Sequence, residues 1–494
     1  MFFFLLQTRE LLLFGNIHFF WTFFVFVWAV WAVKATVAGF YQPTPSSESA
    51  SRLTGSAVIP VVDEPLEVFE EVLARVSASE IEQIIVVING RRNPGIEQVC
   101  KKFPGRVEWV HTPTPGKRNA VALGVRRSRG DLVALVDSDT IWQPDTWVEL
   151  RAAFGSAKVG GATTHQRIFN PGRHWLTRYA DWLEDIRCRT SMPAMSVLGQ
   201  VGCLPGRTIA FRRHLLNRFM DDFLNDVYLG THLEISDDRA LTNYTLRAGY
   251  RTVYQRTSVV YTDAPTNLRT FVKQQYRWSK GSQYNTLRMV PWMLRKTPLL
   301  LLCFAADVII PFFLFAVVFT MIVDTILYHP PLFDAPPAAI LWGEALVGAL
   351  VGTVIRQWAH LWHAPLDLVF LPVFLCLLFL LMPPIRLIGF FRAAFDEGWG
   401  TRADAYVGGA RRSLLRFVPI CLGILMTTFF CLIGLMLEQP QASLRILTSP
   451  SGQSFLVAVA ELLVATTVGL VYGRSRVPAP QPPHARAEFA LEAR

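Results

Sequence analysis

The chain has 494 residues, of which 51% are hydrophobic and 17% charged, and its formal net charge is +10. This size and composition accommodate one soluble domain together with a membrane domain. The basic residues flank apolar stretches, so they favour a membrane surface over nucleic acid as the partner. The seven cysteines have no CxxC or metal-ligand spacing, which argues against a disulfide framework and fits a reducing cytoplasm.

The first predicted element is an apolar helix of 23 residues from Leu11 to Val33. At 1.5 Å per residue it is long enough to cross a hydrocarbon core of ~30 Å. Lys34 follows it and favours a cytoplasmic flank on that side. A cleaved signal peptide is the disfavoured alternative, because the apolar region is too long and no basic cluster precedes it. Residues 1–41 are therefore read as a transmembrane segment and 42–56 as a Ser/Pro-rich linker.

Residues 57–267 read as alternating strands and helices. Short apolar strands are predicted at Val58–Val62, Ile84–Ile88 and Leu132–Val136, and Pro65 starts a helix of amphipathic period. This order predicts an α/β domain with a parallel sheet covered on both faces. Ligands of such sheets bind at the carboxyl ends of the strands.

The remainder of the chain is mostly apolar. Residues 268–297 are expected to form interfacial amphipathic helices, and 298–473 a transmembrane region. Four spans are expected after the soluble domain: 299–323, 338–355, 417–437 and 455–472. With the N-terminal span they make five crossings, an external N-terminus and a cytoplasmic soluble domain in the inner (plasma) membrane.

A further apolar block from Leu366 to Met382 is read differently. A full crossing there would place the basic segment 398–402 and the tail outside, against the positive-inside rule. We therefore expect this block to be interfacial or re-entrant on the cytoplasmic side. His360 and His363 have the spacing of a metal pair, but with no third ligand nearby an interfacial position is favoured. The Pro/Ala-rich tail, 474–494, is expected to be disordered and cytoplasmic.

Two motifs suggest a nucleotide diphosphate site. Asp137 and Asp139 end an apolar strand, where two carboxylates can hold Mg²⁺ or Mn²⁺. The alternative is a polar strand-to-loop turn. Lys117 and Arg118 begin a helix after a Pro-rich turn, and a helix start with two cations suits phosphate. The alternative here is a solvated basic turn.

Two later motifs supply a base and a sugar platform. Asp237 and Asp238 are adjacent carboxylates, of which one can serve as a general base. The alternative is a capped helix start, with Ser236 as the N-cap. Gln274, Arg277 and Trp278 share one helical face at i, i+3 and i+4, so a guanidinium for phosphate lies beside an indole for a sugar ring. An interfacial aromatic belt is the alternative.

The order of these motifs resembles that of the hyaluronan synthases, within the processive family-2 glycosyltransferases. The resemblance rests on SDDRALTN at 236–243 and QQYRWSKG at 274–281, and GWGTR at 398–402 extends it. It implies a GT-A-like nucleotide-sugar-binding α/β domain inserted between transmembrane helices of a polytopic membrane protein. It also implies a gating loop within 366–405 that closes over bound nucleotide.

The resemblance also implies roles for individual residues. Asp238 would be the base with Asp237 orienting it, and Asp139 would be the direct metal ligand with Asp137 near the ribose and metal. The nucleotide-sugar would further be contacted by Asp63, Glu64, Asn89, Lys117, Arg118, Gln274, Arg277, Trp399, Thr401 and Arg402. The acceptor would be contacted by Trp278, Cys203, Gly206 and Arg207, where Arg207 meets an acidic sugar or a phosphate, or bridges to a local carboxylate.

These observations predict a processive, inverting β-glycosyltransferase. It would use UDP-sugars and Mg²⁺ or Mn²⁺ to elongate a hyaluronan-like extracellular or capsular polysaccharide and pass it through the lipid bilayer. Two alternatives remain: a non-processive enzyme that glycosylates a lipid, and a catalytically inactive polysaccharide transport subunit.

Overall fold

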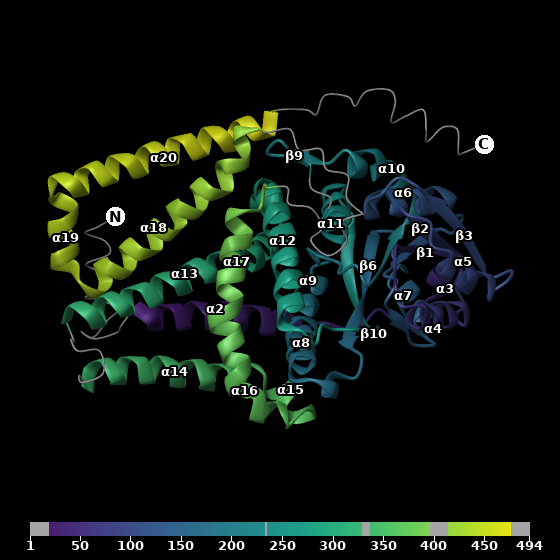
Figure 1. Cartoon of the computed structure of the whole chain (residues 1–494), viewed down its shortest axis with the longest axis horizontal. Coiled ribbons are helices and arrows are strands. Elements are labelled where there is room, and N and C mark those ends of the chain that lie inside the picture. Colours follow the sequence, from purple (N-terminus) through teal and green to yellow (C-terminus); the bar gives the residue numbers. More distant parts are fainter. Residues whose placement is uncertain (1–18, 233–234, 329–335, 396–412, 476–494) are drawn as a thin grey trace.

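A computed structural model describes residues 19–232, 235–328, 336–395 and 413–475, and all structural statements below refer to these. Figure 1 shows an α/β domain on one side and a group of long helices on the other, with α12 (Leu268–Lys296) and α17 (Met382–Phe391) between them. The predicted division into a soluble and a membrane part is therefore visible in the arrangement of the elements.

The α/β domain is built on an eight-stranded sheet of order β3-β2-β1-β4-β7-β6-β10-β5. Its strands are β1 (Gly55–Val61), β2 (Gln83–Asn89), β3 (Val107–Thr112), β4 (Leu132–Val136), β5 (Ile141–Trp142), β6 (Val159–Ile168), β7 (Thr208–Arg212) and β10 (Arg251–Thr262). The strands β3, β2, β1 and β4 are mutually parallel, and Val58 pairs with Ile85 on one side and Leu135 on the other. The sheet is mixed, because β7 runs antiparallel to β4 and β6, and β5 runs antiparallel to β10.

Helices cover both faces of this sheet. They are α4 (Leu66–Ser77), α5 (Pro94–Lys101), α6 (Lys117–Arg127), α7 (Thr146–Ala152), α8 (Trp175–Ile186), α9 (Met192–Val197), α10 (Arg213–Leu224) and α11 (Asp237–Arg247), with the short helices η1 (Pro171–Arg173) and η2 (Arg187–Ser191) and a small hairpin of β8 (Val227–Tyr228) and β9 (Thr231–His232). Alternate residues of β1 point to opposite faces. Val58 joins a core with α6 and α11, whereas Ile59 joins one with α4 and α7. The predicted α/β fold, covered on both faces, is confirmed. The prediction of a parallel sheet is wrong beyond β4, because β7 and β5 run antiparallel to their neighbours.

The membrane part comprises further helices. They are α2 (Phe19–Ala38), α13 (Pro298–Tyr328), α14 (Pro336–Arg356), α15 (Trp358–His363), α16 (Asp367–Cys376), η3 (Leu377–Leu381), η5 (Leu414–Phe417), α18 (Val418–Glu438), α19 (Pro440–Thr448) and α20 (Pro450–Ser475), and a one-turn α3 (Glu48–Ser51) lies in the linker. Residues 268–297, expected to hold several interfacial helices, form the single helix α12.

Five described helical runs are long and apolar enough to cross a membrane. They are Phe19–Ala38, Pro298–Ile326, Asp367–Phe391, Leu414–Glu438 and Pro450–Leu470. Four coincide with expected spans, and α14 covers the expected span 338–355. The block from Leu366 to Met382 differs from expectation, because it belongs to a continuous helical run of 25 residues that passes through Pro383 and Pro384. Its length allows a crossing. Figure 1 nevertheless shows α16 and α17 running alongside α12, across the direction of α2 and α14, so the interfacial placement stays a prediction.

His360 does not pair with His363 in a metal site. Its ring is buried, with Nδ1 3.2 Å from Asp185 Oδ2 and Nε2 2.8 Å from Asp367 Oδ2. Arg178 Nη1 lies 2.9 Å from the other oxygen of Asp367. Burial alone would lower the pKa of His360, but the hydrogen bonds to the two carboxylates outweigh it and raise the pKa to about 9. His360 thus joins α15 to α8 and α16.

Candidate active site

The carboxyl ends of β1 and β4, neighbours in the sheet, carry the first acidic group. Asp137 to Asp139 follow β4, and Ser138 donates a hydrogen bond of 2.9 Å to Glu64 in the loop after β1. Asp63 lies exposed in the same loop. Burial, together with the charges of Asp137 and Glu64, raises the pKa of Asp139 to about 6. The structure thus brings together carboxylates that the sequence predicts at strand ends.

These carboxylates fit a cation that is completed by a substrate. Among the described residues, no three His, Cys, Asp or Glu side chains converge as a preformed metal site. Mg²⁺ is commonly bound by one or two carboxylates together with substrate phosphates. Burial is the main cause of the raised pKa of Asp139, and the charges of Asp137 and Glu64 add to it; a divalent cation would offset this accumulated negative charge. Asp137 and Asp139 therefore suit the predicted role, with phosphates supplying the remaining ligands.

Helix α6 begins beside them. Its N-cap, Gly116, has a φ of 109°, a conformation that favours glycine. Lys117 Nζ lies 2.7 Å from Asp137 Oδ1 and 3.8 Å from Asp237 Oδ2. Burial would lower the pKa of Lys117, but these carboxylates outweigh burial and raise it, so the ammonium stays charged. At the end of β2, Asn89 donates to Gly116 O at 2.5 Å, and its buried Oδ1 has no hydrogen-bond partner among the described residues.

Arg118 is placed differently from the prediction. Only 3% of its side chain is exposed, and the guanidinium stacks on Phe223 and donates to Phe223 O at 2.7 Å. Its Nη1 lies 3.6 Å from Asp226 Oδ2 and its Nε 3.7 Å from Asp237 Oδ1. Its donors thus face the protein interior, so Arg118 holds other side chains in place behind the phosphate site. Asp226 had no sequence signal, since it lies outside every motif.

The two acidic residues at the start of α11 have distinct surroundings. Asp237 is buried between Lys117 and Arg118, and burial, offset in part by these cations, raises its pKa to about 6. Asp238 is partly exposed, and its Oδ2 accepts from Gly206 N at 3.2 Å. Ser236 does not cap the helix with its side chain; it has a left-handed φ of 67°. Ser236 thus occupies the N-cap position, with acidic residues in the first turn, but the side-chain cap of the alternative reading is wrong. Asp238 is the carboxylate that faces the predicted acceptor residues Cys203 and Gly206.

The predicted acceptor residue Arg207 pairs with a carboxylate that the sequence did not indicate. Arg207 Nη1 lies 2.8 Å from Glu184 Oε1 and donates to Gln166 Oε1 at 3.0 Å. Arg187 also pairs with Glu184, at 2.5 Å, from the π-helical turn η2. Such turns are frequent at functional sites. The local carboxylate considered as one partner for Arg207 is therefore Glu184. It was missed because it lies in an ordinary amphipathic helix, α8.

Arg207 also connects this motif to α12. Its guanidinium carbon lies 5.9 Å from the ring centroid of Trp278, whose side chain remains exposed. Gln274, Arg277 and Trp278 lie on α12 with the predicted i, i+3, i+4 spacing, and Cys203 Sγ is 4.0 Å from Asp238 Oδ2. Trp278, Arg207 and Asp238 are thus near one another. Trp399, Thr401 and Arg402, the predicted gating residues, lie outside the described residues.

A family model described as "Glycosyltransferase like family 2" matches residues 56–281, the segment that holds these groups. This segment is a family-2 glycosyltransferase domain. Hyaluronan synthase from Streptococcus pyogenes is 32% identical to the chain over 259 residues, which cover 50% of this chain and 61% of that protein. An N-acetylglucosaminyltransferase from Mesorhizobium japonicum is 31% identical over 237 residues, covering 47% and 56%. The chain thus spans less than two thirds of the length of these curated relatives, and its resemblance to hyaluronan synthases is confirmed.

A solved glycosyltransferase shares the fold. A mannosyltransferase from Pyrobaculum calidifontis, in complex with GDP-mannose and Mn²⁺, superimposes with a TM-score of 0.53 and 15% identity. The match covers 76% of this chain and 98% of that one. The likeness concerns the fold, and it agrees with the GT-A-like architecture expected for this family-2 domain.

Proposed function

We propose that this chain is a membrane-embedded hexosyltransferase that transfers sugars from a UDP-linked donor to a growing polysaccharide, with inversion at the anomeric carbon. The observation that carries this proposal is the position of Lys117. Its ammonium bridges Asp137, on the donor side, and Asp237, beside the base. Strand-end carboxylates, a phosphate-binding cation and a general base are thereby held in one site.

Donor binding involves the groups around Lys117. Lys117 and Arg277 hold the diphosphate. Asn89 Oδ1, which has no hydrogen-bond partner among the described residues, accepts from an N–H of the uracil ring of the donor. Asp139 and Asp137 would hold Mg²⁺ or Mn²⁺ together with the phosphates. When bound, such a cation neutralises the diphosphate and makes UDP a better leaving group.

Transfer itself is the work of Asp238. The acceptor hydroxyl attacks the anomeric carbon from the face opposite UDP, and Asp238 removes its proton as the new glycosidic bond forms. The hydrogen bonds from Gly206 N and Arg239 N, at 3.2 and 2.7 Å, fix the carboxylate in position. Trp278 supplies an apolar ring face for the acceptor sugar. Arg207 lies beside the indole and is itself held by its ion pair with Glu184. Asp237 is buried next to Asp238 and is oriented by Arg118.

Processive synthesis and export complete the proposal. Helix α12, which carries Trp278, leads directly into the membrane helix α13. A polymer leaving Trp278 would therefore pass towards the membrane helices, with the catalytic domain on the cytoplasmic side of the inner membrane. The hyaluronan synthase and N-acetylglucosaminyltransferase relatives support a hyaluronan-like product, which would be extracellular or capsular.

The test is a donor panel. Detergent-solubilised protein with Mg²⁺ or Mn²⁺ is given UDP-sugars singly and in pairs, UDP-N-acetylglucosamine included, and UDP release and product size are recorded. High-mass product supports the proposal, and a need for two donors supports a hyaluronan-like polymer. Small or lipid-linked product would indicate a glycolipid transferase. No turnover in wild-type protein would indicate a transport subunit. Asp221→Asn, at a side chain 93% exposed, is the matched control for Asp238→Asn.

A further inference from the structure

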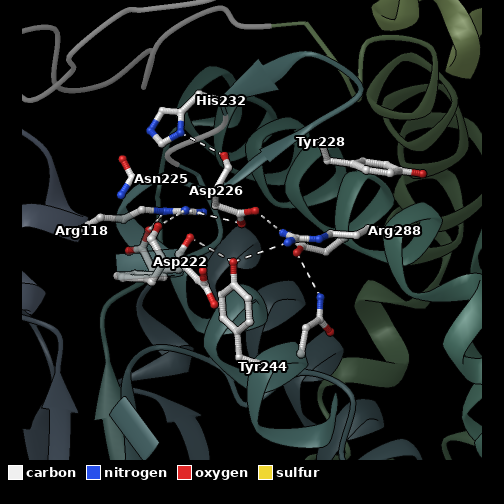
Figure 2. A network of polar contacts seen from close by, with 12 residues as sticks. Arg118, Asp222, Asn225, Asp226, Tyr228, His232, Tyr244 and Arg288 are labelled. Atoms are coloured by element: carbon white, nitrogen blue, oxygen red, sulfur yellow. Dashed lines mark hydrogen bonds and ion pairs between the residues drawn. The ribbon is translucent and has the colours of Figure 1, made fainter. Parts of the chain in front are cut away.

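A buried carboxylate outside all of the motifs joins three parts of the site. The side chain of Asp226 is 1% exposed and forms ion pairs with Arg118 from α6 and Arg288 from α12 (Figure 2). A lone buried carboxylate is costly, because its charge is removed from water. Here two arginines from different helices offset that cost, and the carboxylate of Asp226 holds the two arginines together.

Helix α12 holds the segment around Asp226 at a second place. One turn before Arg288, the hydroxyl of Tyr284 lies 3.2 Å from Tyr228 O and 3.0 Å from Thr231 O, and its single proton serves these two carbonyl oxygens. His232 Nδ1 lies 2.9 Å from the carbonyl oxygen of Asp226 (Figure 2). Segment 226–232 is thus held by two side chains at i, i+4 on α12, which share one helical face: Tyr284 contacts its backbone and Arg288 the Asp226 carboxylate.

The same network reaches α11. Arg288 Nη2 donates to Tyr244 Oη at 3.4 Å, and that hydroxyl donates to Asp222 O at 3.2 Å (Figure 2). Burial and the charge of Asp226 raise the pKa of Tyr244 to about 12, so this phenol is a neutral donor. Tyr244 lies two turns beyond Asp237 on α11. Arg118, for its part, extends from Asp226 to Asp237.

We propose that Asp226 is a positioning residue, which clamps Arg118 and Arg288 and thereby fixes α12 against α6 and the start of α11. The clamp sets the place of Trp278 and Arg277, which α12 carries, relative to Asp238. It rests on the proposed function, since the residues that it positions are those proposed to contact the acceptor, the diphosphate and the general base. Asp226 itself touches no substrate.

The test separates positioning from mere stability. The variants are Asp226→Asn, Arg288→Met, Arg288→Lys and the double Asp226→Asn/Arg288→Met. Arg295→Met, an exposed arginine two turns further along α12, is the matched control. For each, kcat, donor KM and melting temperature are measured, with kcat expressed per mole of folded protein.

A misplacement of about 1 Å costs on the order of 10²-fold in rate. We therefore expect Asp226→Asn and Arg288→Met to lower kcat by ~10- to 100-fold. Donor KM should rise by a smaller factor, because Arg277 moves with α12 whereas Lys117 and Asp137 remain in place. Arg288→Lys should restore part of kcat, and the double variant should be no worse than the worse single one, since both act through one contact. Unchanged kcat per folded protein, with only a lower melting temperature, would overturn the proposal.

An unfolded variant and an inactive wild-type protein each call for a separate measurement. If Asp226→Asn does not fold, the Arg288 pair of variants decides, because Arg288 is 18% exposed and a substitution there leaves Asp226 paired with Arg118. If wild-type protein transfers no sugar, the proposed function fails, and hydrogen exchange judges the clamp by itself. Asp226→Asn should then speed exchange of the α12 amides from 277 to 289, while Arg295→Met should not. Unchanged exchange would refute the clamp.

Discussion

Replacing Gly281 by alanine tests how closely α12 must approach the base. A Cβ at Gly281 would lie 2.7 Å from Ser236 Cβ and 3.1 Å from Ser236 Oγ. Ser236 directly precedes Asp237 and Asp238, and its left-handed φ of 67° leaves its backbone little freedom to adjust. Alanine at 281 would therefore push α11 and α12 apart at the start of α11.

The size of the effect follows from these distances. Ordinary contact between carbon atoms begins near 3.4 Å, so the two elements must separate by about 0.7 Å. Overpacking of this kind costs ~1–3 kcal/mol of unfolding free energy. A displacement approaching 1 Å at a catalytic group costs up to ~10²-fold in rate. We expect Gly281→Ala to lower kcat by at least ~10-fold and to lower the melting temperature.

The assay is UDP release by purified protein across donor concentrations, with thermal unfolding in parallel. Ser236→Gly combined with Gly281→Ala should recover most of kcat relative to Ser236→Gly alone. It removes both clashing atoms, leaves Ile235 Cδ1 at 3.7 Å as the next neighbour, and suits the positive φ. Gly343→Ala on α14 is the control, since a Cβ there meets no atom within 4 Å. A full rate for Gly281→Ala, or no recovery in the double variant, would refute the reasoning.

Three other outcomes are expected. Asp238→Asn should lower the rate by ~10²- to 10⁴-fold, the usual size of a general-base effect, while UDP binding measured by calorimetry stays unchanged; substantial activity would remove Asp238 as the base. Because the pKa of Asp139 is raised to about 6, the carboxyl takes up a proton as pH falls through 6, so half-maximal activity should need more Mn²⁺ at pH 5.5 than at pH 7.5. An equal requirement at both pH values would contradict this. The pKa of His360 is raised to about 9. Its ion pairs therefore stabilise the folded state fully below pH ~6.5, and this stabilisation is lost as the pH rises towards 9. The melting temperature should fall over that range in wild-type protein and fall less in His360→Gln; parallel curves would exclude this role.

Local pattern predicted the strands and the faces of helices. The apolar runs at β1, β2 and β4 read as buried strands because each is apolar on both sides, and Asp137 follows the last of them. The spacing of Gln274, Arg277 and Trp278 likewise placed them on one face, because a helix repeats every 3.6 residues. These features depend on neighbours within a few positions, so they could be read from the sequence.

Tertiary structure decided the partners. Asp226 and Arg288 are 62 residues apart, and Arg178 and Asp367 are 189 apart, distances over which no periodic pattern operates. Arg118 resembled a phosphate ligand because it sits at a helix start, but the fold turns its guanidinium inward to Asp226 and Phe223. The sequence by itself determined which residues carry charge and where helices and strands form. Which charges are buried together depends on the tertiary contacts between distant segments of the chain. Burial strengthens the ion pairs of Asp226, Glu184 and His360, because water does not screen them there.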